Sequence, residues 1–159
     1  LWNIFDPGQM LPRDPATLGA TLEAEVTPFV SLLDEEQMAA IERSGGVPGE
    51  LNSLVLNDLV VSAVGAQITG EGSFVFDNTD LESFDGLPRP EGRVDLQVGG
   101  LNQLIDTAIQ MGFVSEQDAM GARMMLGMFT VPGAEPDTAT STLEINAQGH
   151  ILANGQRIQ

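Results

Sequence analysis

Hydrophobic and polar residues alternate along several stretches of this chain. In residues 17–26 every second residue is apolar and the residues between are polar or glycine, which is typical of a strand with one buried face. The same period of two recurs in residues 54–63, 68–76, 93–98 and 143–145, and from residue 150 onward. Asn57-Asp58 interrupts one of these runs and is interpreted as a turn or a bulge. The alternation predicts an antiparallel sheet of about six strands.

Helical spacing replaces this alternation after the strand at 93–98. From Leu101 to Gly112, apolar residues recur at i, i+3, i+4, i+7, i+8 and i+11, as on one face of a helix. Gly112 ends that helix, and Ser115 is expected to cap a second helix over about residues 116–129. The second helix is apolar almost all round, so it is expected to be covered on more than one side.

A second pair of helices is predicted near the start of the chain. Thr27 is expected to cap a short helix with Pro28 at its first position, and Asp34 to begin another. Residues 17–92 and 93–159 would then repeat one order: strand, helix, helix, strand, strand. The predicted fold class is α+β, a single domain whose antiparallel sheet carries two helical hairpins on one face.

Two glycines fall in phase within the strand at 68–76. Gly70 and Gly72 both occupy the apolar register of that strand. Glycine in a strand indicates a bend or the close approach of another element. A packed helix is the simplest explanation.

Residues 1–16 are interpreted as an extended arm pinned by Trp2 and Phe5, or as the cut edge of a longer chain. The chain begins with Leu1 and contains no run near the roughly 18 apolar residues that a membrane span requires. We therefore expect a longer N-terminal part. Any membrane association is expected through a segment absent from this chain.

The acidic composition excludes several classes of function. The formal net charge is −17, with 23 acidic residues, six arginines and no lysine. Such a field repels phosphate backbones, so nucleic acid is not an expected partner. There is no cysteine for thiol chemistry, no lysine for a P-loop, and no elbow motif to receive His150 as a catalytic base. The sequence predicts neither an enzyme nor a cofactor.

One acidic loop concentrates the oxygen ligands that calcium accepts. Asp77, Asp80 and Glu82 lie close together in it, followed by Asp85-Gly86. The loop lacks the glycine and the final glutamate of an EF-hand. A solvated acidic loop is the simpler interpretation, and weak calcium binding is the alternative.

The helix pair is rich in methionine, a side chain that adapts to irregular partners. Packing in the core is the simpler interpretation of these residues. The more specific one is an adaptable hydrophobic surface for a lipid tail or a protein. The candidate binding residues are Leu104, Ile105, Met120, Met124, Met125 and Met128.

Two further stretches carry a resemblance to a known family. They are residues 119–127, Ala-Met-Gly-Ala-Arg-Met-Met-Leu-Gly, and residues 141–157, with Ser-Thr-Leu-Glu-Ile before the Gly149 turn and Ile-Leu-Ala-Asn-Gly-Gln-Arg after it. The chain resembles the C-terminal part of the proteobacterial domain-of-unknown-function family 2125, in its alphaproteobacterial form. The resemblance covers most of the chain and is strongest from Gly92 to the end. Its motifs are structural, so it implies no site residues.

The resemblance implies an exported protein of the cell envelope or periplasm, with repeats similar to those of AsmA-like envelope proteins. We therefore expect a non-enzymatic envelope domain that binds a hydrophobic ligand, such as a lipid, or an envelope protein. The alternative is an accessory or structural subunit of a larger membrane-associated assembly. In that case the strands at 17–26 and 94–98 would be sheet edges that pair with a neighbour.

Overall fold

The computed structural model describes residues 8, 10–11, 15–31 and 33–159. The predicted arm at residues 1–16, with Trp2 and Phe5, therefore lies largely outside the described residues. The described residues form three helices and eight strands: β1 (Thr17–Pro28), α2 (Glu35–Ser44), β2 (Gly49–Ala63), β3 (Ala66–Asp77), β4 (Arg89–Gly99), α3 (Leu101–Gln110), α4 (Glu116–Phe129), β5 (Val131–Pro132), β6 (Thr138–Ile145), β7 (Ile151–Ala153) and β8 (Gln156–Arg157).

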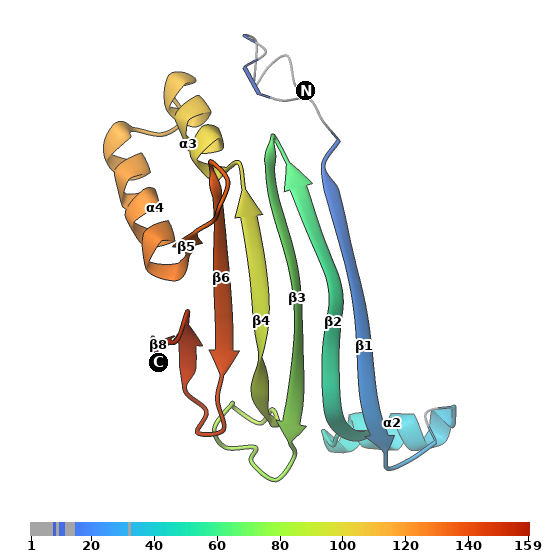
Figure 1. Cartoon of the computed structure of the whole chain (residues 1–159). Coiled ribbons are helices and arrows are strands. Elements are labelled where there is room, and N and C mark those ends of the chain that lie inside the picture. Colours follow the sequence, from blue (N-terminus) through green and yellow to red (C-terminus); the bar gives the residue numbers. More distant parts are fainter. Residues whose placement is uncertain (1–7, 9, 12–14, 32) are drawn as a thin grey trace.

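All eight strands belong to one antiparallel sheet, shown in Figure 1. Their spatial order is β1-β2-β3-β4-β6-β7-β8, and β5 pairs with the outer side of β6. The prediction of a mixed fold with an antiparallel sheet is confirmed. The estimate of about six strands was too low because two further short strands form, at 131–132 and, after the turn at 154–155, at 156–157.

The strand register gathers most apolar side chains on one face of the sheet and most polar side chains on the other. Residues directly opposite each other in neighbouring strands point to the same face. In the row that begins at Leu22, the partners are Leu56, Gly72, Val94 and Leu143, all apolar or glycine. The next row, from Glu23, includes Val55, Ser73, Arg93 and Glu144, is mainly polar and points to the opposite side.

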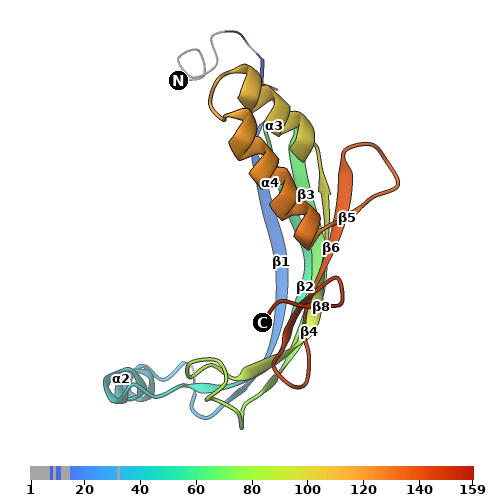
Figure 2. The same ribbon diagram turned by 90° about the vertical axis from the view of Figure 1, so that its left-hand side faces the viewer.

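We call the first side the concave apolar face, because Figure 2 shows the sheet curved, with all three helices on its hollow side. Val98 and Ala139 of this face share a cleft with Leu101 of α3 and Leu126 of α4, which places the face on the helical side. Its large apolar residues are Leu18, Leu22, Val26, Leu51, Leu54, Leu56, Leu59, Val61, Ile68, Phe74, Phe76, Val94, Leu96, Val98, Leu143, Ile145 and Ile151.

Two asparagines in β2 keep this separation of faces intact. The register of β1 against β2 shifts at Asn52 and again at Asn57, so each asparagine is an extra, unpaired residue of a β-bulge. The side chain of Asn52 donates to Thr27 Oγ1 over 2.8 Å, and that of Asn57 donates to Glu23 Oε1 over 2.8 Å. The interruption at Asn57 is thus a bulge, and β2 continues through it.

The first predicted helix pair is wrong. Thr27 and Pro28 do not begin a helix: they complete β1 and pair with Glu50 and Gly49 of β2. In the described part of this stretch α2 is the one helix, with its cap residue Asp34 accepting hydrogen bonds from the backbone of Glu36 and Gln37 at 3.0 and 3.1 Å. The described residues of the first half therefore form one helix and those of the second half form two, so the predicted repeat of 17–92 in 93–159 is not confirmed.

Gly70 and Gly72 do not mark the position of a packed helix. A Cβ atom on Gly72 would lie 2.6 Å from the Arg93 carbonyl oxygen and 2.9 Å from the Val94 Cα atom. One on Gly70 would lie 2.6 Å from a methyl group of Leu96. The close approach comes from the neighbouring strand β4, and on the other side Gly70 and Gly72 lie opposite the bulge in β2.

The described residues enclose very little core. Those that are fully buried are Ala119, Ala153 and Ser141. The large apolar side chains of the central strands are half-buried, and those of β1 are exposed. No described helix is long and apolar enough to cross a membrane. The fold therefore displays much of its apolar surface on one side of the sheet.

Candidate functional site

The concave apolar face is least covered along β1. Leu18, Leu22 and Val26 are 81%, 59% and 51% exposed. Their partners on β2, among them Leu56, are half-buried because they have strands on both sides. Apolar side chains exposed in one continuous patch are typical of a binding surface.

The helix pair α3–α4 borders this face at one end of the sheet (Figures 1 and 2). Gly100 precedes α3 in a left-handed conformation and offers no side chain to cap the helix. Asp137, from the loop before β6, caps it instead. Its carboxylate accepts hydrogen bonds from the backbone N–H of Asn102 at 3.0 Å and of Gln103 at 2.9 Å.

These hydrogen bonds set the ionisation of Asp137. Burial raises the pKa of its carboxyl group, but the N–H groups of Gln103 and Asn102 outweigh this effect and hold the pKa below its ordinary value of 3.8. The nearby positive charge of Arg123 acts in the same direction. Asp137 is thus an ionised cap that ties α3 to the sheet.

A small residue and an ion pair join α4 to α3. Ala119 is completely buried, so nothing larger than its methyl group fits at that contact. Arg123 of α4 pairs with Asp106 of α3 at 2.6 Å, and its Nε donates to Asn102 Oδ1 at 3.3 Å. The predicted cap of α4 is confirmed, since Ser115 Oγ accepts a hydrogen bond from the backbone of Asp118 at 3.1 Å.

The methionines of α4 are on its open side. Met120, Met124, Met125 and Met128 are between 63% and 69% exposed, and we call these four residues the methionine surface. The prediction that they pack in the core is wrong for the described structure, as is the expectation that α4 is covered on more than one side. Sequence alone cannot tell a covered apolar helix from an uncovered one.

The two candidate residues of α3 lie in a different environment. Leu104 and Ile105 are half-buried on the packed side of that helix. They support the helix pair and do not extend the methionine surface. The structure thus groups four of the six candidate binding residues on one exposed helix side.

A cleft of about 450 Å³ separates α4 from the sheet. Val98 and Ala139 line its sheet side, and Leu101, Leu126 and Gly127 line its helical side. Sequence analysis did not select these residues, because a cleft between a helix and a strand leaves no periodic signal. The apolar register of Val98 and the packed side of α3 are the only local indications.

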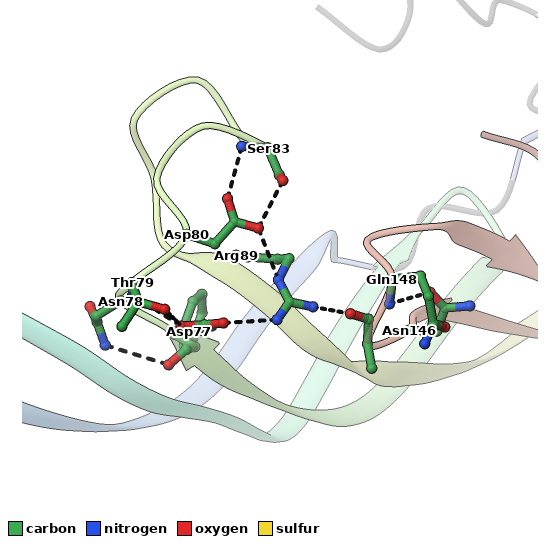
Figure 3. A network of polar contacts seen from close by, with 10 residues as sticks. Asp77, Asn78, Thr79, Asp80, Ser83, Arg89, Asn146 and Gln148 are labelled. Carbon is green, nitrogen blue, oxygen red and sulfur yellow. Dashed lines mark hydrogen bonds and ion pairs between the residues drawn. The ribbon is translucent and has the colours of Figure 1, made fainter.

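The acidic loop between β3 and β4, residues 78–88, holds an ordered polar network with the strand ends at Asp77 and Arg89, shown in Figure 3. Arg89 bridges Asp77 at 2.8 Å and Asp80 at 3.1 Å, and also donates to the Ala147 carbonyl oxygen. The Thr79 hydroxyl and then Arg89 lower the pKa of Asp77 to about 2. The network fixes the loop beside the turn that precedes β7.

The network bears on the calcium hypothesis for Asp77, Asp80 and Glu82. The oxygens of the two aspartates already accept hydrogen bonds from Thr79, Ser83 and Arg89, and the backbone N–H of Glu82 also helps to lower the pKa of Asp80. No group of three or more potential metal-ligating side chains occurs among the described residues. Calcium binding stays a prediction that this geometry does not favour.

The strand at 94–98 is not a sheet edge. It lies within β4, which has β3 on one side and β6 on the other. Of the two edge strands expected from the sequence, only the one at 17–26 lies at an edge, since among the described residues β1 pairs with β2 alone.

Comparison with known proteins identifies one relationship. The sequence model of a family described as "Uncharacterized protein conserved in bacteria (DUF2125)" matches residues 4–152. No curated protein and no solved structure matches the chain. The similarity to AsmA-like envelope proteins stays an expectation.

Proposed function

The chain belongs to the bacterial family DUF2125, and we propose that this domain is a non-enzymatic envelope protein that holds the acyl chains of a lipid against its concave apolar face. The observation that carries the proposal is the register of the sheet. Six strands (β1 to β4, β6 and β7) direct apolar residues to one face, and most of that face has no covering layer among the described residues.

The hydrophobic effect favours an occupant for this face. Burying a leucine or valine side chain that is otherwise exposed contributes about 1.5–3 kcal/mol. Leu18, Leu22 and Val26 alone offer several such contacts. Each methylene group of an acyl chain contributes about 0.8 kcal/mol when it leaves water. A single acyl chain lying across several strands would bury the exposed side chains of the face and its own methylene groups at the same time.

The methionine surface and the cleft beside α4 are two further apolar regions, on the open side and the packed side of that helix. Methionine has a flexible, polarisable side chain that adapts to ligands of irregular shape. Met124 and Met128 lie on the open side of α4, whereas Leu126 and Gly127 line the cleft. We propose that the helix pair closes one end of the lipid site.

The charge of the domain limits the kind of lipid. A net charge of −17 repels anionic membrane surfaces and anionic head groups. A lipid with a neutral or zwitterionic head group fits this field better. The proposal assigns no catalytic residue and no cofactor, and it places the domain in the periplasm or cell envelope.

Native mass spectrometry of protein purified from its own envelope fraction tests the proposal directly. We expect extra mass in the lipid range, released by an organic extraction. The proposal would be refuted if the purified protein carries no lipid mass and also fails to bind the neutral fluorescent probe N-phenyl-1-naphthylamine.

Three variants then locate the site. Leu22→Glu and Met124→Asp replace exposed apolar residues and should leave the melting temperature unchanged. Leu22→Glu should weaken probe binding at least fivefold. Thr21→Glu, on the opposite face of the same strand, is the matched control and should change it less than twofold. If Met124→Asp also weakens probe binding, the methionine surface belongs to the site. If Leu22→Glu and Thr21→Glu weaken probe binding equally, the site does not lie on the concave apolar face.

A further inference from the structure

The two edges of the sheet differ in a way that the lipid proposal does not explain. On one side the strands become shorter, with eight residues in β6, three in β7 and two in β8. The N-terminal part of β6 pairs at this edge with β5, which contains Pro132. Short strands and proline are devices that keep an edge from pairing with another chain.

The other edge, β1, has none of these devices. It is 12 residues long and has no lysine, and its only proline is its last residue, Pro28. The extra residues of both bulges, Asn52 and Asn57, belong to β2, so the outer side of β1 stays regular. In an edge strand, every second residue directs its N–H and C=O outward. Nearly all of β1 is exposed, and among the described residues only β2 pairs with it.

The charge beside this edge has one sign. Glu23 and Glu25 point to the convex face, and among the described residues their carboxylates accept hydrogen bonds from neutral groups, those of Asn57, at 2.8 Å, and Ser53, at 3.4 Å. The ion pairs of the described residues involve other carboxylates. Asp58 of β2 adds a further negative charge to the same face, opposite Thr21.

From this edge we propose that β1 accepts a β-strand from another polypeptide, with apolar residues at alternate positions and basic residues between them. The backbone of the added strand would continue the sheet ladder. Its apolar side chains would lie beside Leu18, Leu22 and Val26, and its basic side chains beside Glu23 and Glu25. A second copy of this chain fits less well, since it adds a charge of −17 and further glutamates at the same edge.

The probe for this site is a 12-residue peptide with valine at every second position and lysine or threonine between. One control peptide carries glutamate in place of lysine, and another carries two internal prolines, which cannot complete the ladder. We expect binding of the lysine peptide alone. Hydrogen exchange should then slow at amides of β1 and not at those of β6 to β8.

Charge reversal provides the matched test on the protein. Glu23→Lys with Glu25→Lys should weaken binding of the lysine peptide about tenfold or more and create binding of the glutamate peptide. Glu71→Lys with Glu91→Lys changes the same total charge on the convex face of β3 and β4, away from the edge, and should change affinity less than threefold.

Three results would overturn the proposal. The first is an equal loss of affinity in both double variants, which would indicate attraction by net charge alone. The second is binding of the proline peptide as tightly as the lysine peptide. The third is a dimer of the chain, seen by sedimentation and lost on charge reversal at β1, that the lysine peptide cannot displace.

Discussion

The cap that Asp137 supplies to α3 gives the sharpest test of how the helix pair is held. Asp137 lies 34 and 35 residues from the backbone groups that it binds, at Gln103 and Asn102. Removing it leaves two N–H groups at the start of α3 without that acceptor. Loss of an N-cap acceptor destabilises a protein by about 0.5–2 kcal/mol. Because the acceptor here is a partly buried carboxylate, we expect the upper half of that range.

The backbone conformation of Asp137 allows two substitutions to distinguish loss of the cap from backbone strain. Its φ is 53°, in the left-handed region, which glycine occupies freely and alanine does not. Asp137→Gly should therefore lose only the cap, about 1.3–2 kcal/mol. Asp137→Ala should lose about 1 kcal/mol more. In a domain of this size each kcal/mol lowers the melting temperature by about 2–4 °C.

The sign of the pH dependence follows from the lowered pKa of Asp137. A carboxyl group with a lower pKa in the folded state stabilises the protein above its unfolded pKa, about 3.9, and this stabilisation is lost as the pH falls through the folded value. Urea unfolding of wild type and Asp137→Asn should thus show the full difference at pH 6 and a smaller one at pH 3. A difference that is the same at both pH values, or Asp137→Gly as stable as wild type at pH 6, would refute the assignment.

Three other changes test the packing and the acidic loop. Ala119→Leu should destabilise the domain by about 1–3 kcal/mol in urea unfolding, because Ala119 is fully buried. The control Ala122→Leu, on the exposed side of α4, should change stability by less than about 0.5 kcal/mol. Gly72→Ala should destabilise it as well, since a Cβ atom there meets the backbone of β4; unchanged stability would contradict that contact. Arg89→Gln should raise the pKa of Asp77 from about 2 but leave it below 3.8, because the hydrogen bonds from Thr79 remain. An NMR titration of the Asp77 carboxyl group measures this change. An unchanged pKa would show that the ion pair with Arg89 does not influence Asp77.

The sheet could be predicted from the sequence because its signal is local and repeated. Alternation over residues 17–26, 68–76 and 93–98 reports which face each side chain takes, whatever the neighbouring strand is. The bulge at Asn57 could be anticipated for the same reason, since it interrupts a continuing pattern. The α3–α4 pair has equally local signals, including the cap at Ser115.

Features that depend on distant partners could not be predicted. Thr27-Pro28 has the local chemistry of a helix start, yet its pairing with Glu50 and Gly49 makes it the end of a strand. The role of Asp137 depends on a helix that begins 36 residues earlier in the sequence. The exposure of Met124 depends on what covers α4, which no pattern within the helix encodes. For the candidate site, residue types were therefore predictable and their burial was not.

The two proposed surfaces meet along β1, and this has a thermodynamic consequence. Leu22 is exposed at the edge, whereas Leu56, one strand inward on the same face, is half-buried because it has a strand on each side. A strand added to β1 would give Leu22 a second neighbour and widen the concave apolar face by one strand. A lipid that contacts both β1 and the added strand would bind more tightly when the partner is present. By linkage, the lipid must then raise the affinity of the partner by the same factor, so each surface is best measured with the other both empty and filled.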